Sequence, residues 1–166
     1  MNTNNLSNTQ KITISAMMMA IYIVVMYITQ SFAFGAVQIR IATALYALSY
    51  LFPFLVLPFG LANCLSNLLF GGLGIADILG GFVVGIITAG VSAYLGKKNI
   101  KYYFVALPVI LFPSLVVAIW LSKLLGIPYA ALAPSLVLGQ IVPGIFGAVL
   151  VRVLGAVLLG RKEHVK

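Results

Sequence analysis

The sequence predicts an all-α integral membrane protein, a bundle of six transmembrane helices with both termini in the cytoplasm. The chain is 63% hydrophobic and 7% charged over 166 residues, whereas soluble domains carry about 25% charged residues. Its lysines and arginines also gather in a few short stretches that lie between long apolar segments. A surface so poor in charge requires lipid as its solvent, and the placement of the basic stretches predicts the orientation.

Six apolar segments are candidate membrane spans, because a spanning helix needs about 20 apolar residues. Glycines, prolines and a lysine-rich stretch separate the segments and supply their turns. Pro53 and Pro58 are expected to bracket the turn after the second segment, although residues 39–70 are apolar throughout and allow other divisions. The six expected spans cover residues 12–34, 39–52, 54–70, 75–95, 102–125 and 134–159.

The expected organisation is one membrane domain with short polar ends. Residues 1–10 are polar and lack lysine and arginine, which is unlike a cleavable signal peptide. We therefore expect residues 1–10 to be a disordered cytoplasmic N-terminus, residues 11–160 to be the six-helix domain, and residues 161–166 to be a basic cytoplasmic tail.

The basic residues indicate membrane topology and not nucleic-acid binding. With six spans, eight of the ten lysines and arginines fall on one side, and Arg40 and Lys123 fall towards the other. The positive-inside rule then places both termini in the cytoplasm, where the basic residues also meet anionic lipid head groups. Five or seven spans would divide the basic residues between the two sides. The eight are Lys11, Lys97, Lys98, Lys101, Arg152, Arg161, Lys162 and Lys166.

No sequence motif indicates an enzyme. The chain has no phosphate-binding loop, no His-Glu-x-x-His, no pair of cysteines and no Gly-x-Ser-x-Gly. Its two acids are Asp77 and Glu163, and its one histidine is His164. We therefore expect no catalytic site, cofactor or metal. With one acid in the apolar segments, a proton-coupled carrier is less favoured than a binding protein.

Polar residues of several predicted helices share one depth, near the outer surface. Polar groups in lipid are costly and usually face a cavity or one another. We expect an outward-facing pocket for a small polar molecule, while amides that join helices would give the same pattern. Asp77 is also favoured at a helix N-terminus by the helix dipole. The candidate substrate-binding residues are Gln38, Arg40, Thr43, Asn63, Asn67, Asp77 and Gln140.

Two other groups of residues have alternative interpretations. Four aromatic residues near the polar set could stack on a flat ring, or could form interface belts and core packing. These are Tyr46, Tyr50, Trp120 and Tyr129. In the first segment, Ala16 and Ala20 form a smooth stripe flanked by methionines, which suits a partner helix or internal packing. Gly81 and Gly85 make a similar pattern, which we interpret as packing within the fold.

Two stretches of sequence carry a family resemblance. They read Phe34-Gly35-Ala36-Val37-Gln38-Ile39-Arg40 and Asn67-Leu68-Leu69-Phe70-Gly71-Gly72-Leu73-Gly74-Ile75-Ala76-Asp77. With them the chain resembles the substrate-binding subunits (S components) of energy-coupling factor (ECF) transporters, and above all the QueT family, which is linked to uptake of queuosine precursors. The resemblance implies a six-helix subunit that captures a micronutrient from outside, such as queuine or a related 7-deazapurine.

The chain departs from the family pattern at one position. Thr43 stands where the family usually has glutamate, and a hydroxyl would be a poorer acceptor for the exocyclic amine of a deazapurine. The resemblance also implies partners: a transmembrane T subunit, docked at Ala16 and Ala20, and two cytoplasmic ATPases. The alternatives are an S component for another vitamin, a stand-alone secondary carrier that uses Asp77, and a scaffold protein without a ligand.

Overall fold

The computed structural model describes residues 6–34, 38–71 and 73–159, and the regular structure in these ranges is helical. Within them, five helical segments are long and apolar enough to cross a membrane, and one apolar helix is shorter. The long segments are Asn8–Ala33, Pro53–Gly71, Ile75–Lys97, Tyr102–Leu125 and Tyr129–Leu158, and the short helix is Ile41–Tyr50.

Helix α1 (Asn8–Ala33) begins earlier than the sequence analysis predicted. Ser7 and Gln10 form a capping box, in which the Gln10 N–H donates to Ser7 Oγ at 3.2 Å and the Ser7 N–H donates to Gln10 Oε1 at 2.9 Å. The pair satisfies two backbone groups at the helix start. The helix therefore includes residues 8–10 of the predicted tail and ends one residue before the predicted boundary.

The second predicted span is the short helix η2 (Ile41–Tyr50), which has 3₁₀ geometry. Its ten residues rise about 20 Å at about 2 Å per residue, which is less than the hydrocarbon thickness of about 30 Å. The prediction of a membrane-spanning helix over residues 39–52 is therefore wrong in length, and the count of six spans stays a prediction. No residue of η2 is exposed, and the helix contacts α1, α2, α3, α4 and α5. It is the central element of the bundle.

The third segment is a continuous run of η3 (Pro53–Leu55), α2 (Val56–Ser66) and the π-helical turn η4 (Asn67–Gly71). Pro58, which was expected to bracket the preceding turn, lies inside α2. Pro58 is in the first turn of α2, directly after the 3₁₀ turn η3, and proline is tolerated in the first turn of an α-helix. The prediction for Pro58 was wrong for this reason.

The last three long segments are α3 (Ile75–Lys97), η5 (Tyr102–Val105) continued by α4 (Ala106–Leu125), and α5 (Tyr129–Leu159). The bounds predicted for the fifth segment are confirmed, and α3 is two residues longer than predicted. Helix α5 begins five residues before its predicted start, because the N–H groups of Ala131 and Leu132 donate to the Pro128 carbonyl and form the first turn there.

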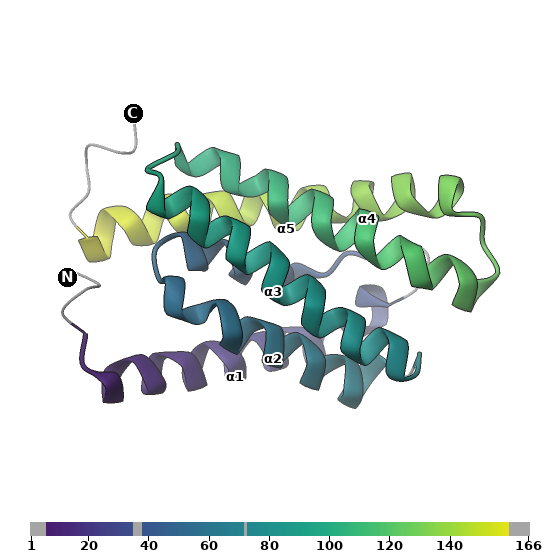
Figure 1. Ribbon diagram of the computed structural model, residues 1–166, viewed down its shortest axis with the longest axis horizontal. Helices are drawn as coiled ribbons and strands as arrows, with labels where there is room; N and C mark the ends of the chain where they lie inside the picture. Colours follow the sequence, from purple (N-terminus) through teal and green to yellow (C-terminus); the bar gives the residue numbers. More distant parts are fainter. Residues whose placement is uncertain (1–5, 35–37, 72, 160–166) are drawn as a thin grey trace.

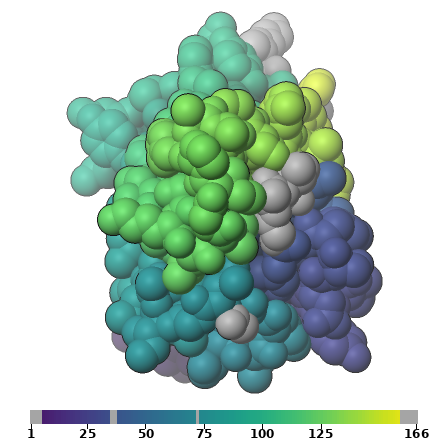
Figure 2. Space-filling model, turned by 90° about the vertical axis from the view of Figure 1, so that its right-hand side faces the viewer, coloured from purple at the N-terminus to yellow at the C-terminus, as the bar shows by residue number. Residues whose placement is uncertain are grey.

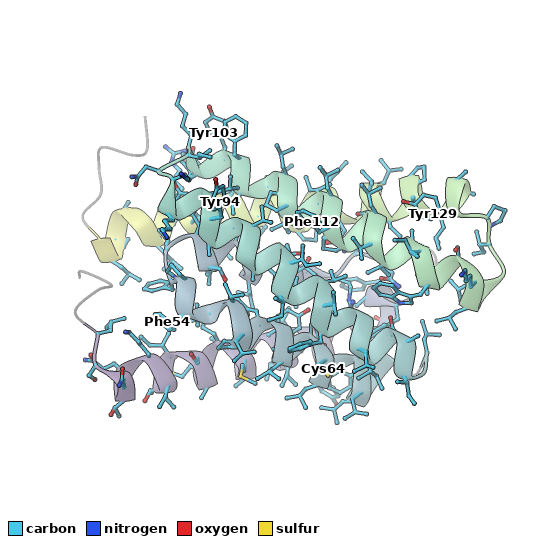
Figure 3. The ribbon with its side chains drawn as sticks, in the orientation of Figure 1. Phe54, Cys64, Tyr94, Tyr103, Phe112 and Tyr129 are labelled. Atoms are coloured by element: carbon cyan, nitrogen blue, oxygen red, sulfur yellow. The ribbon has the colours of Figure 1, made fainter. Side chains whose placement is uncertain are left out.

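The start of α1 and the end of α5 lie at the same end of the bundle, together with the connection between α3 and η5 (Figure 1). The connections α2–α3 and α4–α5 lie at the opposite end. This arrangement agrees with the predicted division of the basic residues that the structure describes. Arg161, Lys162 and Lys166 of the predicted tail lie outside the described residues, and the cytoplasmic position of the termini stays a prediction. Phe54, Tyr94 and Tyr103 lie towards the first end and Tyr129 towards the second (Figure 3), as expected for aromatic residues at membrane interfaces.

Two glycines, Gly60 and Gly85, allow a close approach between α2 and α3. A Cβ atom added to Gly85 would lie 2.9 Å from the Cα of Gly60 and 3.2 Å from the carbonyl oxygen of Phe59. Helices in lipid gain stability from such close packing of small residues. The structure therefore agrees with the interpretation of Gly85 as packing within the fold.

Replacing Gly85 with alanine should destabilise the protein by about 1–3 kcal/mol, because the backbone of α2 cannot move away without losing contacts. Gly90→Ala is the matched control on the same helix. Its new Cβ would meet one atom, Val56 Cγ1, at 4.0 Å. Because no clash opposes it, the higher helix propensity of alanine, up to about 1 kcal/mol relative to glycine, should stabilise this variant. Thermal unfolding in detergent measures both, and equal melting temperatures for the two variants would contradict the close contact.

Candidate functional site

The seven candidate substrate-binding residues are all buried, with exposed fractions between 1% and 4%. They come from the segment before η2, from η2, from α2 with η4, from α3 and from α5. We call them the polar cluster: Gln38, Arg40, Thr43, Asn63, Asn67, Asp77 and Gln140. Figure 2 shows the end of the molecule opposite the termini, where α1 and η2 (purple and blue), the α2–α3 region (teal) and the α4–α5 connection (green) meet.

Arg40 places a guanidinium group inside the bundle, immediately before η2. Its Nη2 donates a hydrogen bond to Asn67 Oδ1, and its Cζ lies 5.0 Å from the centroid of the Phe34 ring. The Nε atom is buried and has no hydrogen-bond partner among the described residues. A buried cation in a membrane protein is costly unless it is paired, and among the described residues Arg40 has a hydrogen-bond acceptor for Nη2 and none for Nε.

Thr43 and Gln140 join η2 to α5. Thr43 Oγ1 lies 2.6 Å from the Arg40 carbonyl oxygen and 2.8 Å from Gln140 Oε1, and its single proton is donated to one of them at a time. Gln140 Nε2 donates to the Gln38 carbonyl oxygen at 3.3 Å. Gly139 makes this approach possible, because a Cβ atom there would lie 2.5 Å from the same carbonyl oxygen.

Asn67 and Asp77 extend the cluster to α3 and α4. Asn67 Nδ2 donates to the Asp77 carbonyl oxygen at 2.8 Å. Trp120 Nε1, on α4, donates to Asp77 Oδ1 at 3.3 Å. Asp77 is the third residue after the N-cap Gly74, where the helix dipole also favours a carboxylate. Both predicted roles of Asp77, as a site residue and at a helix terminus, are therefore compatible with its position.

Asn63 lies one helical turn before Asn67 and completes the cluster. Its Nδ2 donates to the Gly81 carbonyl oxygen at 2.7 Å, while its Oδ1 is buried without a hydrogen-bond partner among the described residues. A Cβ atom on Gly81 would lie 2.4 Å from Asn67 Nδ2 and 3.3 Å from Asn63 Nδ2. Gly81 thus gives both amides room, a role that the sequence pattern of small residues did not reveal.

Of the four aromatic residues considered for ring stacking, one contacts the polar cluster through a hydrogen bond and three have other surroundings. Trp120 contacts Asp77. Tyr46 is fully buried, and its hydroxyl lies 2.8 Å from that of Tyr22. Tyr50 donates to the carbonyl of Ile100, in the connection at the other end of the bundle. Tyr129 is 44% exposed.

The stacking interpretation is therefore wrong for Tyr50, since it lies far along η2 from Arg40. Sequence reasoning missed Phe34, which contacts the Arg40 guanidinium. A possible signal was its position at the start of the stretch that ends in Arg40. No sequence signal was available for the hydrogen bond between Trp120 and Asp77, because the two residues are far apart in the chain.

Ala16 and Ala20 lie outside the polar cluster, on an exposed side of α1. Met17, beside them, is 56% exposed. The stripe is therefore on the surface and is not buried by internal packing of this chain.

The polar cluster offers hydrogen-bond donors and acceptors from five segments of the chain. No group of three or more His, Cys, Asp or Glu residues that could hold a metal ion occurs in the described ranges. A family model described as QueT transporter matches residues 12–156.

The chain belongs to the QueT transporter family. Comparisons with curated proteins and with solved structures gave no match. Members of the QueT family are transporters and not enzymes, and the five long apolar helices make this member a multi-pass membrane protein. The predicted family, the membrane location and the non-enzymatic nature of the chain are thereby confirmed.

Replacing Asn67 with leucine should destabilise this QueT family member by about 2 kcal/mol, because Arg40 loses its acceptor and a hydrogen bond to a charged group contributes about 1.5–3 kcal/mol. That corresponds to a melting temperature lower by about 4–8 °C. Leu68→Ala is the control, since Leu68 is the next residue and is 60% exposed. A melting temperature for Asn67→Leu as high as that of the control would show that the Arg40 contact is not stabilising.

Proposed function

We propose that this chain is the substrate-capture S component of an ATP-driven ECF importer, and that its substrate is a queuosine precursor, queuine or a related 7-deazapurine. The observation that supports this function best is the buried polar cluster, in which Arg40 Nε and Asn63 Oδ1 have no partner among the described residues. Leaving a buried donor or acceptor without a hydrogen bond costs about 1–3 kcal/mol. A ligand that supplies both missing partners would recover that cost.

The chemistry of the two atoms selects a class of ligand. Arg40 Nε is a donor that requires an acceptor oxygen or nitrogen, and Asn63 Oδ1 is an acceptor that requires an N–H. A purine-like ring offers both on one edge, where a carbonyl lies beside a ring N–H. The Asp77 carboxylate, held by Trp120, supplies a further acceptor, and the Phe34 ring beside Arg40 supplies an apolar surface for a flat molecule.

Binding requires the closed end of the bundle to open. The cluster residues are at most 4% exposed, so a substrate must separate the surrounding segments and replace contacts such as Arg40–Asn67. Charge-assisted hydrogen bonds from Arg40 to the substrate would replace those lost. Closure over the substrate would then exclude water and strengthen the remaining polar contacts, as tight capture requires.

The energy for import would come from other subunits. The sequence holds no nucleotide-binding motif, which agrees with a transmembrane T subunit and two cytoplasmic ATPases as partners. The exposed stripe of Ala16 and Ala20 on α1 provides a surface that a helix of the T subunit could approach closely, because small residues allow backbones to come near one another in lipid.

A second candidate is an S component for a different vitamin, and Thr43 favours it. The Thr43 hydroxyl lies within 2.8 Å of both the Arg40 carbonyl and Gln140 Oε1. This hydroxyl links η2 to α5, and it is a weaker acceptor for an exocyclic amine than a glutamate at that position. A heterocycle without that amine would bind to the same cluster through Arg40, Asn63 and Asp77.

Arg40→Ala should weaken substrate binding by about 10- to 100-fold, because it removes charge-assisted hydrogen bonds of about 1.5–3 kcal/mol. Lys123→Ala is the matched control, because Lys123 is exposed and lies outside the cluster. Trp120, the single tryptophan, contacts Asp77 and provides an intrinsic fluorescence signal. Titration of the purified protein with queuine and its deazapurine precursors measures the affinity.

Unchanged binding by Arg40→Ala would contradict the proposed site. Two controls distinguish the loss of substrate contacts from unfolding of the variant. They are Arg40→Lys, which keeps the positive charge, and a thermal unfolding curve. Tight binding of another vitamin, and none of the deazapurines, would favour the second candidate. A wild-type protein that binds neither class would contradict both.

The double variant Ala16→Trp with Ala20→Trp should abolish co-purification with the T subunit while substrate affinity remains unchanged. The two indoles would keep the partner helix away from α1, and both positions are exposed and lie apart from the cluster. Leu138→Trp on α5 is the control, because Leu138 is 67% exposed. Normal assembly of the double variant would show that the T subunit binds elsewhere.

A further inference from the structure

A groove on the outside of the bundle, between α3 and α4, has no role in the proposed transport site. Its volume is about 670 Å³, and the described residues that line it are all apolar, among them Leu95, Ile100, Phe104, Leu111, Phe112 and Val116. Phe112 is labelled midway along α4 in Figure 3. In a membrane such a groove faces lipid, so it favours an apolar occupant.

The length of the groove corresponds to one leaflet of the bilayer. Along α4 and the turn before it, the lining runs from Phe104 to Val116, which is about 18 Å at about 1.5 Å per residue. Half of the hydrocarbon thickness is about 15 Å. The groove starts at the connection between α3 and η5, where Ile100 lines it. A transmembrane helix of a partner would need the whole thickness, whereas the acyl chain of a phospholipid needs one leaflet.

Three lysines lie in or beside the connection at which the groove starts. Lys97, Lys98 and Lys101 are all exposed and lie between or beside Leu95 and Ile100, which line the groove. Lys98 Nζ lies 5.8 Å from the Tyr94 ring centroid, and Lys101 Nζ lies 5.9 Å from that of Tyr103.

Asp77 is the one acidic residue in the described ranges. It lies near the start of α3, away from the end of the groove where the lysines are. Asp77 is therefore too far away to pair with these lysines, which can contact an anionic head group. Tyr94 and Tyr103 lie towards the same end of the bundle (Figure 3), and such aromatic residues are enriched at membrane interfaces.

We propose that the α3–α4 groove and this lysine group form a binding site for one anionic phospholipid. One acyl chain lies in the groove, and the phosphate contacts Lys98 and Lys101. A zwitterionic lipid can fill the groove but gains less from the lysines. Because each lysine near an anionic head group contributes appreciably, the site should prefer phosphatidylglycerol over phosphatidylcholine of the same chains by about 10- to 30-fold.

The test uses the full chain in detergent micelles that contain equal amounts of phosphatidylglycerol and phosphatidylcholine, with native mass spectrometry to identify the retained lipid. The wild type should retain one phosphatidylglycerol. Lys98→Gln with Lys101→Gln should reduce the preference by about tenfold or more, and Leu111→Trp, which fills the groove, should remove the bound lipid of both kinds. The matched control is Lys11→Gln with Lys123→Gln, which removes the same charge elsewhere and should retain the preference.

Three results would overturn the proposal. The first is equal retention of the two lipids by the wild type, and the second is a control variant that loses the preference for phosphatidylglycerol as much as Lys98→Gln with Lys101→Gln does. The third is a lipid retained by Leu111→Trp. A measurement without substitutions covers the case in which a variant does not fold. The wild type is washed on a column in about 0.1 M or 1 M NaCl, which shortens the screening length from about 10 Å to about 3 Å, and the retained lipid is quantified. A preference that is the same at both concentrations would also overturn the proposal.

Discussion

The arrangement of the polar end of the bundle depends on the cost of burying the Arg40 guanidinium in a protein surrounded by lipid. Arg40 is 4% exposed, and its charge is met by the Asn67 amide and the Phe34 ring. Asn67 is in turn held by the backbone of α3 at Asp77, whose carboxylate accepts from Trp120 on α4. One buried cation thus fixes the relative positions of η2, η4, α3 and α4 through a chain of hydrogen bonds. Among the described residues, Arg40 Nε in this chain and Asn63 Oδ1 beside it have no hydrogen-bond partner, and the proposed substrate would supply one to each.

The polar end is possible because small residues let the helices approach closely. Gly81 leaves the space that the Asn67 amide occupies, and Gly139 lets α5 approach the Gln38 carbonyl. Farther along the bundle, Gly60 and Gly85 bring α2 and α3 almost into backbone contact. The narrow 3₁₀ helix η2 fits in the centre that these contacts create. In lipid, where apolar side chains gain little by leaving the solvent, this packing and the hydrogen bonds supply the specificity that a hydrophobic core supplies in water.

The proposed activities use separate surfaces of the same bundle. The polar cluster lies at the end opposite the start of α1 and the end of α5, the stripe of Ala16 and Ala20 lies on an exposed side of α1, and the apolar groove lies between α3 and α4. Figure 1 shows α1 and α4 along opposite edges of the molecule, so a T subunit on α1 and a phospholipid beside α4 need not compete. A capture subunit has to release its substrate to partners while it stays in the membrane, and separate surfaces for substrate, partner and lipid are compatible with both requirements.

The sequence by itself determined the membrane class, the bounds of the fifth segment, the family and the residues of the polar cluster. Hydropathy and charge are local properties that the solvent selects directly, and a polar residue in an apolar segment is visible without knowledge of its neighbours. Tertiary structure decided that residues 41–50 form a short central helix, that Trp120 donates to Asp77, and that Thr43 meets Gln140, which is 97 residues away in the chain. It also decided that Tyr50 lies at the other end of the bundle, and that α3 and α4 leave a groove between them. These features depend on which helices are neighbours. The pattern of Gly81 and Gly85 indicated close packing but did not name the neighbouring helix, because that depends on contacts between residues far apart in the chain.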